Sequence, residues 1–275
     1  MYRLYSLWAR LTLAALLLGV APAHAQSQLI LAISEGTSGG LDHARVIAKY
    51  QDLANTIGGV LKTQVSVVFA REFATLESGI REGRFDFVMA RPSDYPARGM
   101  RDHGYRYVAN ARPDGQCLIV VPKDSPLKRL DDARGKRFVM PEEVSYMSRF
   151  CRAELRDRGI DLAKEKLQYV REQGAITFYM SNNFADVGGI ASYSGPAKKL
   201  EKDGFRILHR SIPQPYFPLV AHEKIRQDQI KAIQAALLAL SDKPGGAEIL
   251  QRIGIAGFDT SAEAQMQALL GWLEK

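Results

Sequence analysis

Side chains that could bind an anion gather in four short polar stretches, each directly after a predicted apolar strand. Hydroxyl, phenol and guanidinium groups all donate hydrogen bonds, and a hydrogen bond to a charged oxygen is strong. The four stretches are EGTSGG, RPSDY, EEVSYMS and ASYSG. The candidate ligand-binding residues within them are Thr37, Ser38, Arg91, Ser93, Tyr95, Ser145, Tyr146, Ser148, Ser192 and Tyr193.

The position of these stretches favours a ligand site over ordinary helix caps. Thr37, Ser38 and Ser145 could each serve only as an N-cap, a common role of small hydroxyl residues at a helix start. Ligands of open α/β sheets, however, bind at the carboxyl ends of strands, where helix N-termini present free N–H groups. Because four strand ends share this pattern, we expect them to line one anion-binding cleft.

Patterns typical of catalysis or metal binding are weak or missing. GTSGG, residues 36–40, fits G-x-S-x-G, but a nucleophile elbow normally follows several strands, and this one follows the first predicted strand. The sequence holds no phosphate-binding loop, H-E-x-x-H or G-x-G-x-x-G pattern. Histidines 43, 103, 209 and 222 show no metal-ligand spacing. We therefore expect a protein that is not an enzyme and uses neither a metal nor a cofactor.

Cys117 and Cys151 are the two cysteines of the chain. In an oxidising compartment, an even number of cysteines suggests a disulfide. Two separate buried thiols are nearly as compatible with the sequence, since Cys117 falls in a predicted strand and Cys151 in a predicted helix. A catalytic cysteine would need a base to form the thiolate, and no histidine lies near either one in sequence.

The first 25 residues have the features of a secretory signal peptide. Arg3 and Arg10 accompany the charge-free run LTLAALLLGVAPAHA, which ends in an A-x-A cleavage pattern. The run is too short for a permanent membrane helix, although an uncleaved anchor is the alternative. We expect cleavage before Gln26 and export to the periplasm. Without the two arginines the net charge falls from +7 to +5, but the basic residues are scattered among acids, so no nucleic-acid partner is expected.

The two halves of the chain resemble each other at a spacing of about 100 residues. GYRYVANARP at 104–113 corresponds to GFRILHRSIP at 204–213. FDFVMARPSDY at 85–95 similarly corresponds to FADVGGIASY at 184–193. A period this long indicates two copies of a whole lobe rather than a solenoid.

Strands and helices alternate within each predicted lobe, which indicates an α/β fold with two mostly parallel sheets flanked by helices. We predict lobe 1 from residues 26–112 and 214–275, and lobe 2 from 113–213, with hinge crossings near 111–116 and 211–216. The predicted strands are 29–34, 65–70, 85–90, 105–110, 137–141, 167–171, 186–191 and 205–210, and the helices before residue 223 are 41–58, 72–82, 146–158, 174–181 and 196–203.

Several segments along the chain resemble the phosphate/phosphite/phosphonate-binding family of periplasmic solute-binding proteins. These receptors of ABC transporters have the two-lobed type II fold, so the resemblance implies that fold here. The matching segments are YQDLANTIGGVLKTQV, LESGIREGRFDFVMARPSDY, KDSPLKRLDDARGKRF, SYMSRFCRAELRDRGI, NNFADVGGIASYSG and AALLALSDKPGGAEILQRIGIAGF.

The resemblance also implies roles for particular residues. Tyr95 matches a tyrosine after the third strand that contacts the oxyanion of the ligand in this family. Ser145 opens a run of hydroxyl residues at a helix start that holds the same oxygens, although Tyr146 departs from the family pattern before Ser148. Gln173 occupies the position where the family often has a histidine.

Two stretches leave alternatives open. Ser192 and Tyr193 stand where the resemblance would place the acidic residue that binds the ammonium group of an aminoalkylphosphonate. In RPSDY, Arg91 and Ser93 are candidates, besides Tyr95, for the residues that line the ligand site. Arg91 could instead pair at the surface with the neighbouring aspartate, a contact worth little.

The resemblance implies a periplasmic receptor that binds a small anion, such as a phosphonate, phosphite or phosphate. Closure of the lobes, a hinge motion, would then deliver the anion to an ABC permease in the inner membrane. One alternative is a ligand-sensing subunit that docks onto a membrane sensor kinase, and another is a receptor for a different small solute. We expect a monomer.

Overall fold

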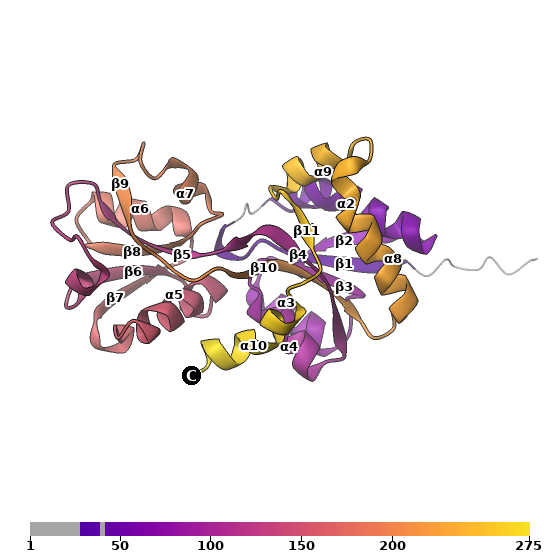
Figure 1. Ribbon diagram of the computed structural model, residues 1–275, viewed down its shortest axis with the longest axis horizontal. Coiled ribbons are helices and arrows are strands. Elements are labelled where there is room, and N and C mark those ends of the chain that lie inside the picture. The colour runs from indigo at the N-terminus through magenta and orange to yellow at the C-terminus, as the bar shows by residue number, and fades with distance from the viewer. Residues whose placement is uncertain (1–27, 39–41) are drawn as a thin grey trace, which may run out of the picture.

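Two β-sheets, each covered by helices, form the two ends of the computed structural model (Figure 1). The structure describes residues 28–38 and 42–275, without the side chain of Ser38. The predicted signal peptide, residues 1–25, lies outside the described residues. Within the described part of the chain, no helix is long and apolar enough to cross a membrane.

In the described part of the chain, the first sheet has six strands in the order β11-β4-β10-β3-β1-β2. β1 pairs in parallel with β2 and β3, whereas β10 and β11 run antiparallel to their neighbours. The sequence of β3, FVMA, is buried throughout, as expected for a strand covered on both faces. The strands are β1 (Leu29–Ser34), β2 (Val65–Phe69), β3 (Phe87–Ala90), β4 (Tyr105–Gly115), β10 (Gln214–His222) and β11 (Gly257–Asp259).

The second sheet, over the same described residues, has five strands in the order β7-β6-β8-β5-β9. β6 pairs in parallel with β7 and β8, and β5 runs antiparallel to β8 and β9. The strands are β5 (Cys117–Pro122), β6 (Arg137–Pro141), β7 (Lys166–Val170), β8 (Val187–Ala191) and β9 (Phe205–Arg210).

The two sheets share one strand order, because β2-β1-β3-β10-β4 corresponds to β7-β6-β8-β5-β9. Each sheet contains one antiparallel strand that follows a strand of the other sheet along the chain. β5 of the second sheet directly follows β4 of the first, and β10 of the first sheet directly follows β9 of the second. The chain therefore crosses twice between the sheets, where β4 and β10 pair up to Gly115 and Gln214. The prediction of two mostly parallel sheets flanked by helices and joined by two crossings is confirmed.

Two aspartates at equivalent positions of the 100-residue repeat make the same backbone contact. The Asp86 carboxylate accepts a hydrogen bond from the Ile30 N–H, 2.8 Å away, at the start of β1. The Asp186 carboxylate accepts one from the Arg137 N–H, 3.0 Å away, at the start of β6. Each aspartate precedes the third strand of its half and fixes it to the first.

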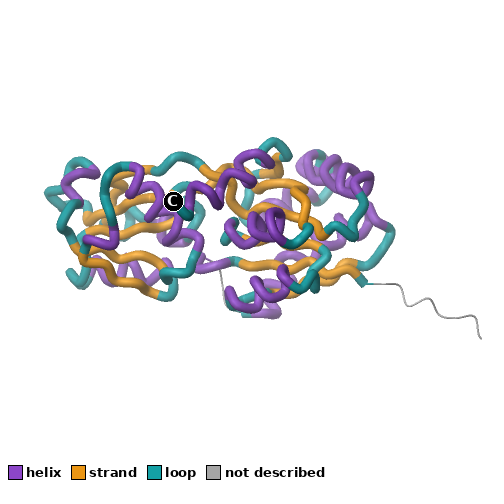
Figure 2. Tube along the Cα trace, turned by 90° about the horizontal axis from the view of Figure 1, so that it is seen from below, coloured by secondary structure: helices purple, strands orange, loops and turns teal. Residues whose placement is uncertain are grey.

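Helices cover both faces of each sheet (Figures 1 and 2). In the first sheet, α2, α8 and α9 share one core with the strands, and α3 and α4 lie in a core on the opposite face. In the second sheet, α5 packs on one face and α6 and α7 on the other. The helices are α2 (His43–Leu61), α3 (Phe73–Arg81), α4 (Asp94–Asp102), α5 (Tyr146–Asp157), α6 (Gln173–Ser181), α7 (Gly195–Lys199), α8 (Gln227–Leu238), α9 (Gly246–Ile253) and α10 (Glu263–Leu273).

We call the first sheet with α2, α3, α4, α8 and α9 lobe 1, and the second sheet with α5, α6 and α7 lobe 2. The C-terminal helix α10 contacts α4 of lobe 1 and α5 of lobe 2. Its residues Met266, Leu269 and Leu270 are buried in the same core as α5. The division of the chain at residues 112/113 and 213/214 stays a prediction.

Three elements differ from the predicted ones: the helix α4, the extended strand β4 and the short strand β11, which was not expected. The helix α4, DYPARGMRD, was not expected, because it contains a proline and a glycine and is strongly polar. Proline is tolerated here since it lies in the first turn, where its missing N–H costs no hydrogen bond. β4 continues beyond residue 110 to Gly115, because β10 pairs with it along the crossing.

Cys117 of β5 and Cys151 of α5 form a disulfide, with their Cα atoms 5.4 Å apart. Of the two alternatives left open by the sequence, the structure therefore has the bonded pair. Both residues are fully buried in the core beneath α5. The bond ties the crossing strand to the helix whose start faces lobe 1.

We predict that replacing both cysteines (Cys117→Ala with Cys151→Ala) lowers the free energy of unfolding. The bond closes a loop of 34 residues, for which chain entropy gives about 2–4 kcal/mol. Equilibrium unfolding in urea, with and without reductant, measures the difference. Wild-type and double-variant proteins that unfold at the same urea concentration without reductant would contradict the prediction.

Candidate ligand-binding site

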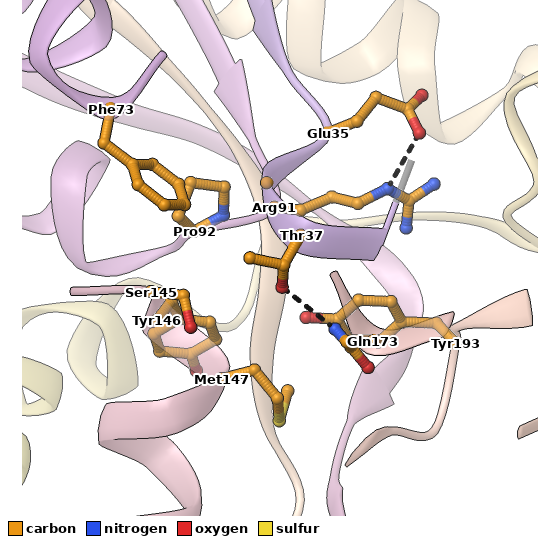
Figure 3. A pocket seen from close by; sticks show the side chains of 11 residues that line it. Glu35, Thr37, Phe73, Arg91, Pro92, Ser145, Tyr146, Met147, Gln173 and Tyr193 are labelled. Atoms are coloured by element: carbon orange, nitrogen blue, oxygen red, sulfur yellow. Dashed lines mark hydrogen bonds and ion pairs between the residues drawn. The ribbon is translucent and has the colours of Figure 1, made fainter. Parts of the chain in front are cut away.

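A small cavity lies between the two lobes, at the carboxyl ends of strands from both sheets (Figure 3). Its volume is about 10 Å³, roughly the space of one water molecule. We call it the interlobe cavity. Lobe 1 contributes Glu35, Gly36, Thr37, Phe73, Arg91 and Pro92, and lobe 2 contributes Ser145, Tyr146, Met147, Gln173 and Tyr193.

The strand order explains why these residues meet. The range 35–37 follows β1, Arg91 follows β3, and Tyr193 follows β8. Ser145 is the N-cap of α5, and Gln173 is the first residue of α6. Where several parallel strands end at one sheet edge and helices begin directly after them, the helix starts present backbone N–H groups and short polar side chains at that edge. The cavity therefore has the hydrogen-bonding groups of an anion site on both sides.

Gln173 connects the two lobes across this cavity. Its Nε2 donates a hydrogen bond to the Thr37 hydroxyl, 3.2 Å away, and its Oε1 accepts one from the Ala191 N–H at 2.6 Å. The contact with Ala191 fixes the amide so that its N–H groups point toward lobe 1. In Figure 3 the Gln173 amide and the Thr37 hydroxyl face each other.

Arg91 and Glu35 are the charged groups of the described cavity lining, and both are buried, with 7% and 4% of their surface exposed. The Arg91 Nε atom lies 3.6 Å from the Glu35 carboxylate, and the Arg91 Nη2 atom donates a hydrogen bond to the Ile253 carbonyl at 3.4 Å. Ile253 ends α9, and a helix C-terminus carries partial negative charge. The guanidinium carbon lies 5.4, 5.6 and 4.4 Å from the ring centroids of Tyr193, Tyr216 and Phe217.

Two of these rings stack on each other across the lobes. Tyr193 of lobe 2 and Tyr216 of β10 have ring centroids 4.1 Å apart and planes 17° apart. Gly115 makes room for the pair, because a Cβ atom there would lie 2.8 Å from Tyr193 and 2.9 Å from Tyr216. The stack closes one side of the space that holds the Arg91 guanidinium.

Phe217 reaches this position through a strained backbone. Its φ is 56°, in the left-handed region that bulky residues rarely adopt. The pairing of β10 with β4 shifts register between Tyr216 and Leu219, which marks a β-bulge around Phe217. The bulge turns the Phe217 ring toward Tyr50 and Arg91. Bulges next to functional sites often redirect a side chain in this way.

Glu35 is shared by two cations. Besides Arg91, its carboxylate contacts Lys49 Nζ at 2.6 Å, and it accepts a hydrogen bond from the Tyr50 hydroxyl. Burial raises the pKa of Glu35, but Arg91 and Lys49 oppose it more strongly, so the pKa lies below its usual value. Glu35 is therefore ionised at neutral pH, and the three charged groups together carry one net positive charge.

A second charged cluster joins the lobes next to the cavity. Asp94, fully buried at the start of α4, contacts Arg98 Nη1 at 3.1 Å and Arg149 Nη1 of α5 at 2.6 Å. Arg98 and Asp94 belong to lobe 1, whereas Arg149 belongs to lobe 2. Like Glu35, Asp94 is a buried carboxylate shared by two cations.

Six of the predicted residues line the interlobe cavity, and four described ones do not. Ser93 donates to the Pro215 carbonyl at 3.1 Å, and Ser192 accepts from the Gln116 N–H at 3.1 Å, so both hydroxyls serve the backbone. Ser148 is buried within α5, outside the lining. The side chain of Ser38 lies outside the described part of the chain. The six lining residues are Thr37, Arg91, Ser145, Tyr146, Gln173 and Tyr193.

The structure places Arg91 in the cavity lining and Tyr95 outside it, and the ligand-binding roles of both residues stay predictions. Tyr95 lies in the first turn of α4, where its ring stacks on Phe73 with the centroids 5.7 Å apart, and it is not part of the cavity lining. The unpredicted helix turns the side chain away from the strand end. Arg91 is buried and pairs with Glu35, rather than forming a surface pair with Asp94.

Sequence reasoning missed several lining residues. Glu35 and Gly36 stood in a stretch already identified as polar, but nothing local indicated that Glu35 would pair with a residue 56 positions away. Phe73 and Met147 lack any polar group, so a search for anion ligands passes over them.

We predict that Glu35→Gln lowers the free energy of unfolding by about 3–5 kcal/mol, because it leaves the buried Arg91 charge without its partner. The matched control is Glu72→Gln, which removes an exposed carboxylate 3.4 Å from Arg171 and should change stability by at most about 0.5 kcal/mol. Urea unfolding measures both. Equal, small effects in the two variants would show that the pair is dispensable.

Solved structures share this fold at low sequence identity. The chain is similar to XAC2383 from Xanthomonas citri bound to ATP, with a TM-score of 0.73, 17% identity, and 90% of this chain and 97% of that chain covered. PhnD1 from Prochlorococcus marinus in complex with methylphosphonate gives a TM-score of 0.71 at 13% identity, with 89% and 96% covered. The predicted two-lobed type II fold is confirmed. A search of curated proteins finds no match.

A protein-family model identifies the family. The model is described as "ABC transporter, phosphonate, periplasmic substrate-binding protein", and it matches residues 40–266, most of the chain. Members of this family bind substrates in the periplasm for ABC transporters and are not enzymes. The chain therefore belongs to the family of phosphonate-binding periplasmic substrate-binding proteins of ABC transporters.

Proposed function

We propose that this protein captures a small phosphorus oxyanion, a phosphonate, phosphite or phosphate, and delivers it to an ABC permease in the inner membrane. The observation that carries the proposal is the interlobe cavity, where helix starts and hydroxyl groups of both lobes meet beside one arginine. An oxyanion there accepts hydrogen bonds from both lobes at once and so favours the closed arrangement.

The proposed cellular setting follows from the rest of the chain. Residues 1–25 would direct export and be removed, leaving a monomeric receptor in the periplasm. The Cys117–Cys151 disulfide suits that oxidising compartment. Closure of the lobes around the ligand would present a surface that the permease distinguishes from the open form.

A nucleotide is the second candidate ligand, because XAC2383 from Xanthomonas citri, with 17% identity, was solved bound to ATP. Its phosphate groups would use the same hydrogen-bond donors. The interlobe cavity, about 10 Å³, has room for about one water molecule, so either ligand requires the lobes to move apart before it enters.

We predict that one phosphorus oxyanion raises the melting temperature of the mature protein in a ligand panel. A ligand at one hundred times its Kd stabilises by about 2.7 kcal/mol, or roughly 5–10 °C for a protein of this size. The panel contains methylphosphonate, phosphite, phosphate, ATP and sulfate, with glucose and lysine as neutral and cationic controls. A shift with ATP alone would favour the nucleotide, and a shift with a control alone would overturn the proposal.

We also predict that Thr37→Val weakens binding of the oxyanion found in that panel by about 2- to 10-fold. Valine keeps the shape of threonine but removes the hydroxyl that accepts from Gln173, and a hydrogen bond of this kind contributes about 0.5–1.5 kcal/mol. Thr37→Ser, which keeps the hydroxyl, is the matched control. Isothermal titration calorimetry gives both Kd values, and equal values in the two variants would remove Thr37 from the site.

A further inference from the structure

Few charged groups line the interlobe cavity in the described part of the chain. Among the described residues that line it, Arg91 is the one cation and Glu35 the one carboxylate. The Nε and Nη1 atoms of Arg91 make no hydrogen bond with any described group. The Nε atom still lies 3.6 Å from the Glu35 carboxylate. The guanidinium, 7% exposed, therefore has weakly satisfied N–H donors beside the cavity, which is costly for a buried group.

The carboxylates near the cavity are already neutralised. Glu35 is held by Arg91 and Lys49, and Asp94 by Arg98 and Arg149. Each carboxylate thus faces two cations. The Glu35 cluster carries one net positive charge, whereas in the Asp94 cluster Arg98 also pairs with Glu274, 3.1 Å away. Tyr50, Tyr193 and Tyr216 add no negative charge, because burial raises the pKa of all three hydroxyls.

The rest of the described lining is uncharged: Thr37, Ser145 and Gln173 are polar, and the other side chains offer apolar surface. Phe73, Pro92 and Met147 contribute no charged group, and the rings of Tyr146 and Tyr193 complete the wall. A methyl or other alkyl group is favourable against such a surface. An ammonium group there would lose its hydration without gaining a free carboxylate, which is costly.

A strained backbone segment in β10 helps to hold the Arg91 side chain in place. The β-bulge at Phe217, with φ 56°, brings an aromatic ring to 4.4 Å from the guanidinium carbon. Strained aromatic backbone persists only where the surroundings enforce it, and such positions cluster at ligand clamps. The side chain is therefore pre-positioned rather than free to move out to solvent.

We propose that Arg91 sets the charge of the ligand, and that the preferred ligand is a phosphonate whose substituent is small and uncharged, not one that carries an ammonium group. This inference rests on the proposed function. Arg91 supplies the counter-charge that Gln173, a neutral side chain, does not. The apolar surface of the lining and the neutralised Glu35 exclude a cationic substituent.

The buried Asp94 carboxylate is a candidate partner for an ammonium group, so the test must include a ligand that carries one. The Asp94 Oδ1 atom is buried and makes no hydrogen bond with the described residues. Asp94 does not line the cavity, so an ammonium group in the cavity would reach it only if the lining rearranged. A ligand with an ammonium group that binds more tightly would identify Asp94 as its partner.

The first experiment compares two ligands of equal size. Propylphosphonate and 2-aminoethylphosphonate differ in a terminal methyl against a terminal ammonium, so calorimetric titration of the wild-type protein isolates the charge. We expect 2-aminoethylphosphonate to bind at least 10-fold more weakly. Equal or tighter binding of 2-aminoethylphosphonate overturns this inference and leaves the proposed function standing. Absence of binding by any phosphonate overturns both.

The second experiment tests Arg91 itself. Arg91→Met should weaken propylphosphonate binding at least 100-fold, and Arg91→Lys about 10-fold, because lysine keeps the charge but lacks the planar fork. Arg45→Met, an exposed arginine on α2, is the matched control and should bind as wild type does.

Folding is checked separately from binding. Circular dichroism and the disulfide content identify a misfolded Arg91→Met, in which case Arg91→Lys decides the question. Arg91→Ala adds a positive readout, since millimolar methylguanidinium can replace the missing group and should restore part of the propylphosphonate binding. An Arg91→Lys variant with wild-type affinity, or no rescue of a folded Arg91→Ala, assigns Arg91 a structural role and overturns the proposal.

Discussion

Removing a guanidinium from water costs several kcal/mol unless other groups replace its hydration. Arg91 is 7% exposed, and several groups of the protein replace the water that its guanidinium has lost. Glu35 supplies the counter-charge, the Ile253 carbonyl accepts a hydrogen bond, and aromatic rings from both lobes and the crossing strand cover the group. These contacts link α9, the crossing strand β10 and lobe 2 around one side chain. The electrostatics of the whole cavity depend on this arrangement.

The exchange of strands between the sheets makes that convergence geometrically possible. β5 and β10 each leave their own half of the chain and run antiparallel in the other sheet. The carboxyl ends of β1 and β3 consequently face those of β6 and β8 across the crossing. Polar strand ends that would be ordinary caps in an isolated lobe become the two walls of a ligand site.

The contacts between the lobes at the cavity combine the Tyr193–Tyr216 ring stack with polar pairs. Gln173 with Thr37 and Asp94 with Arg149 join the two walls, while α10 packs against helices of both lobes. Individual hydrogen bonds of this kind contribute about 0.5–1.5 kcal/mol. An oxyanion that contacts both walls adds interactions of similar size, so its binding can shift the balance between open and closed lobes.

Much of the fold could be predicted from local patterns. Apolar runs marked the strands, and the repeat around Asp86 and Asp186 indicated two lobes, because each aspartate performs the same local task. The polar strand ends indicated the site, and the family resemblance added Gln173. The helix α4 was not predicted, because the local signals in DYPARGMRD are weak, and this helix stacks the Tyr95 ring on Phe73.

The sequence by itself determined most of the strands, the two-sheet α/β pattern and the sheet edges that carry the polar residues, because these depend on alternation of apolar and polar residues along short segments. Only the tertiary structure decided which side chains meet there. The pairing of Arg91 with Glu35, and the rings of Tyr193 and Phe217 around it, join residues from four separate segments. Such contacts depend on how the sheets pack and where β10 bulges. No local pattern of residues indicates which distant segments come together.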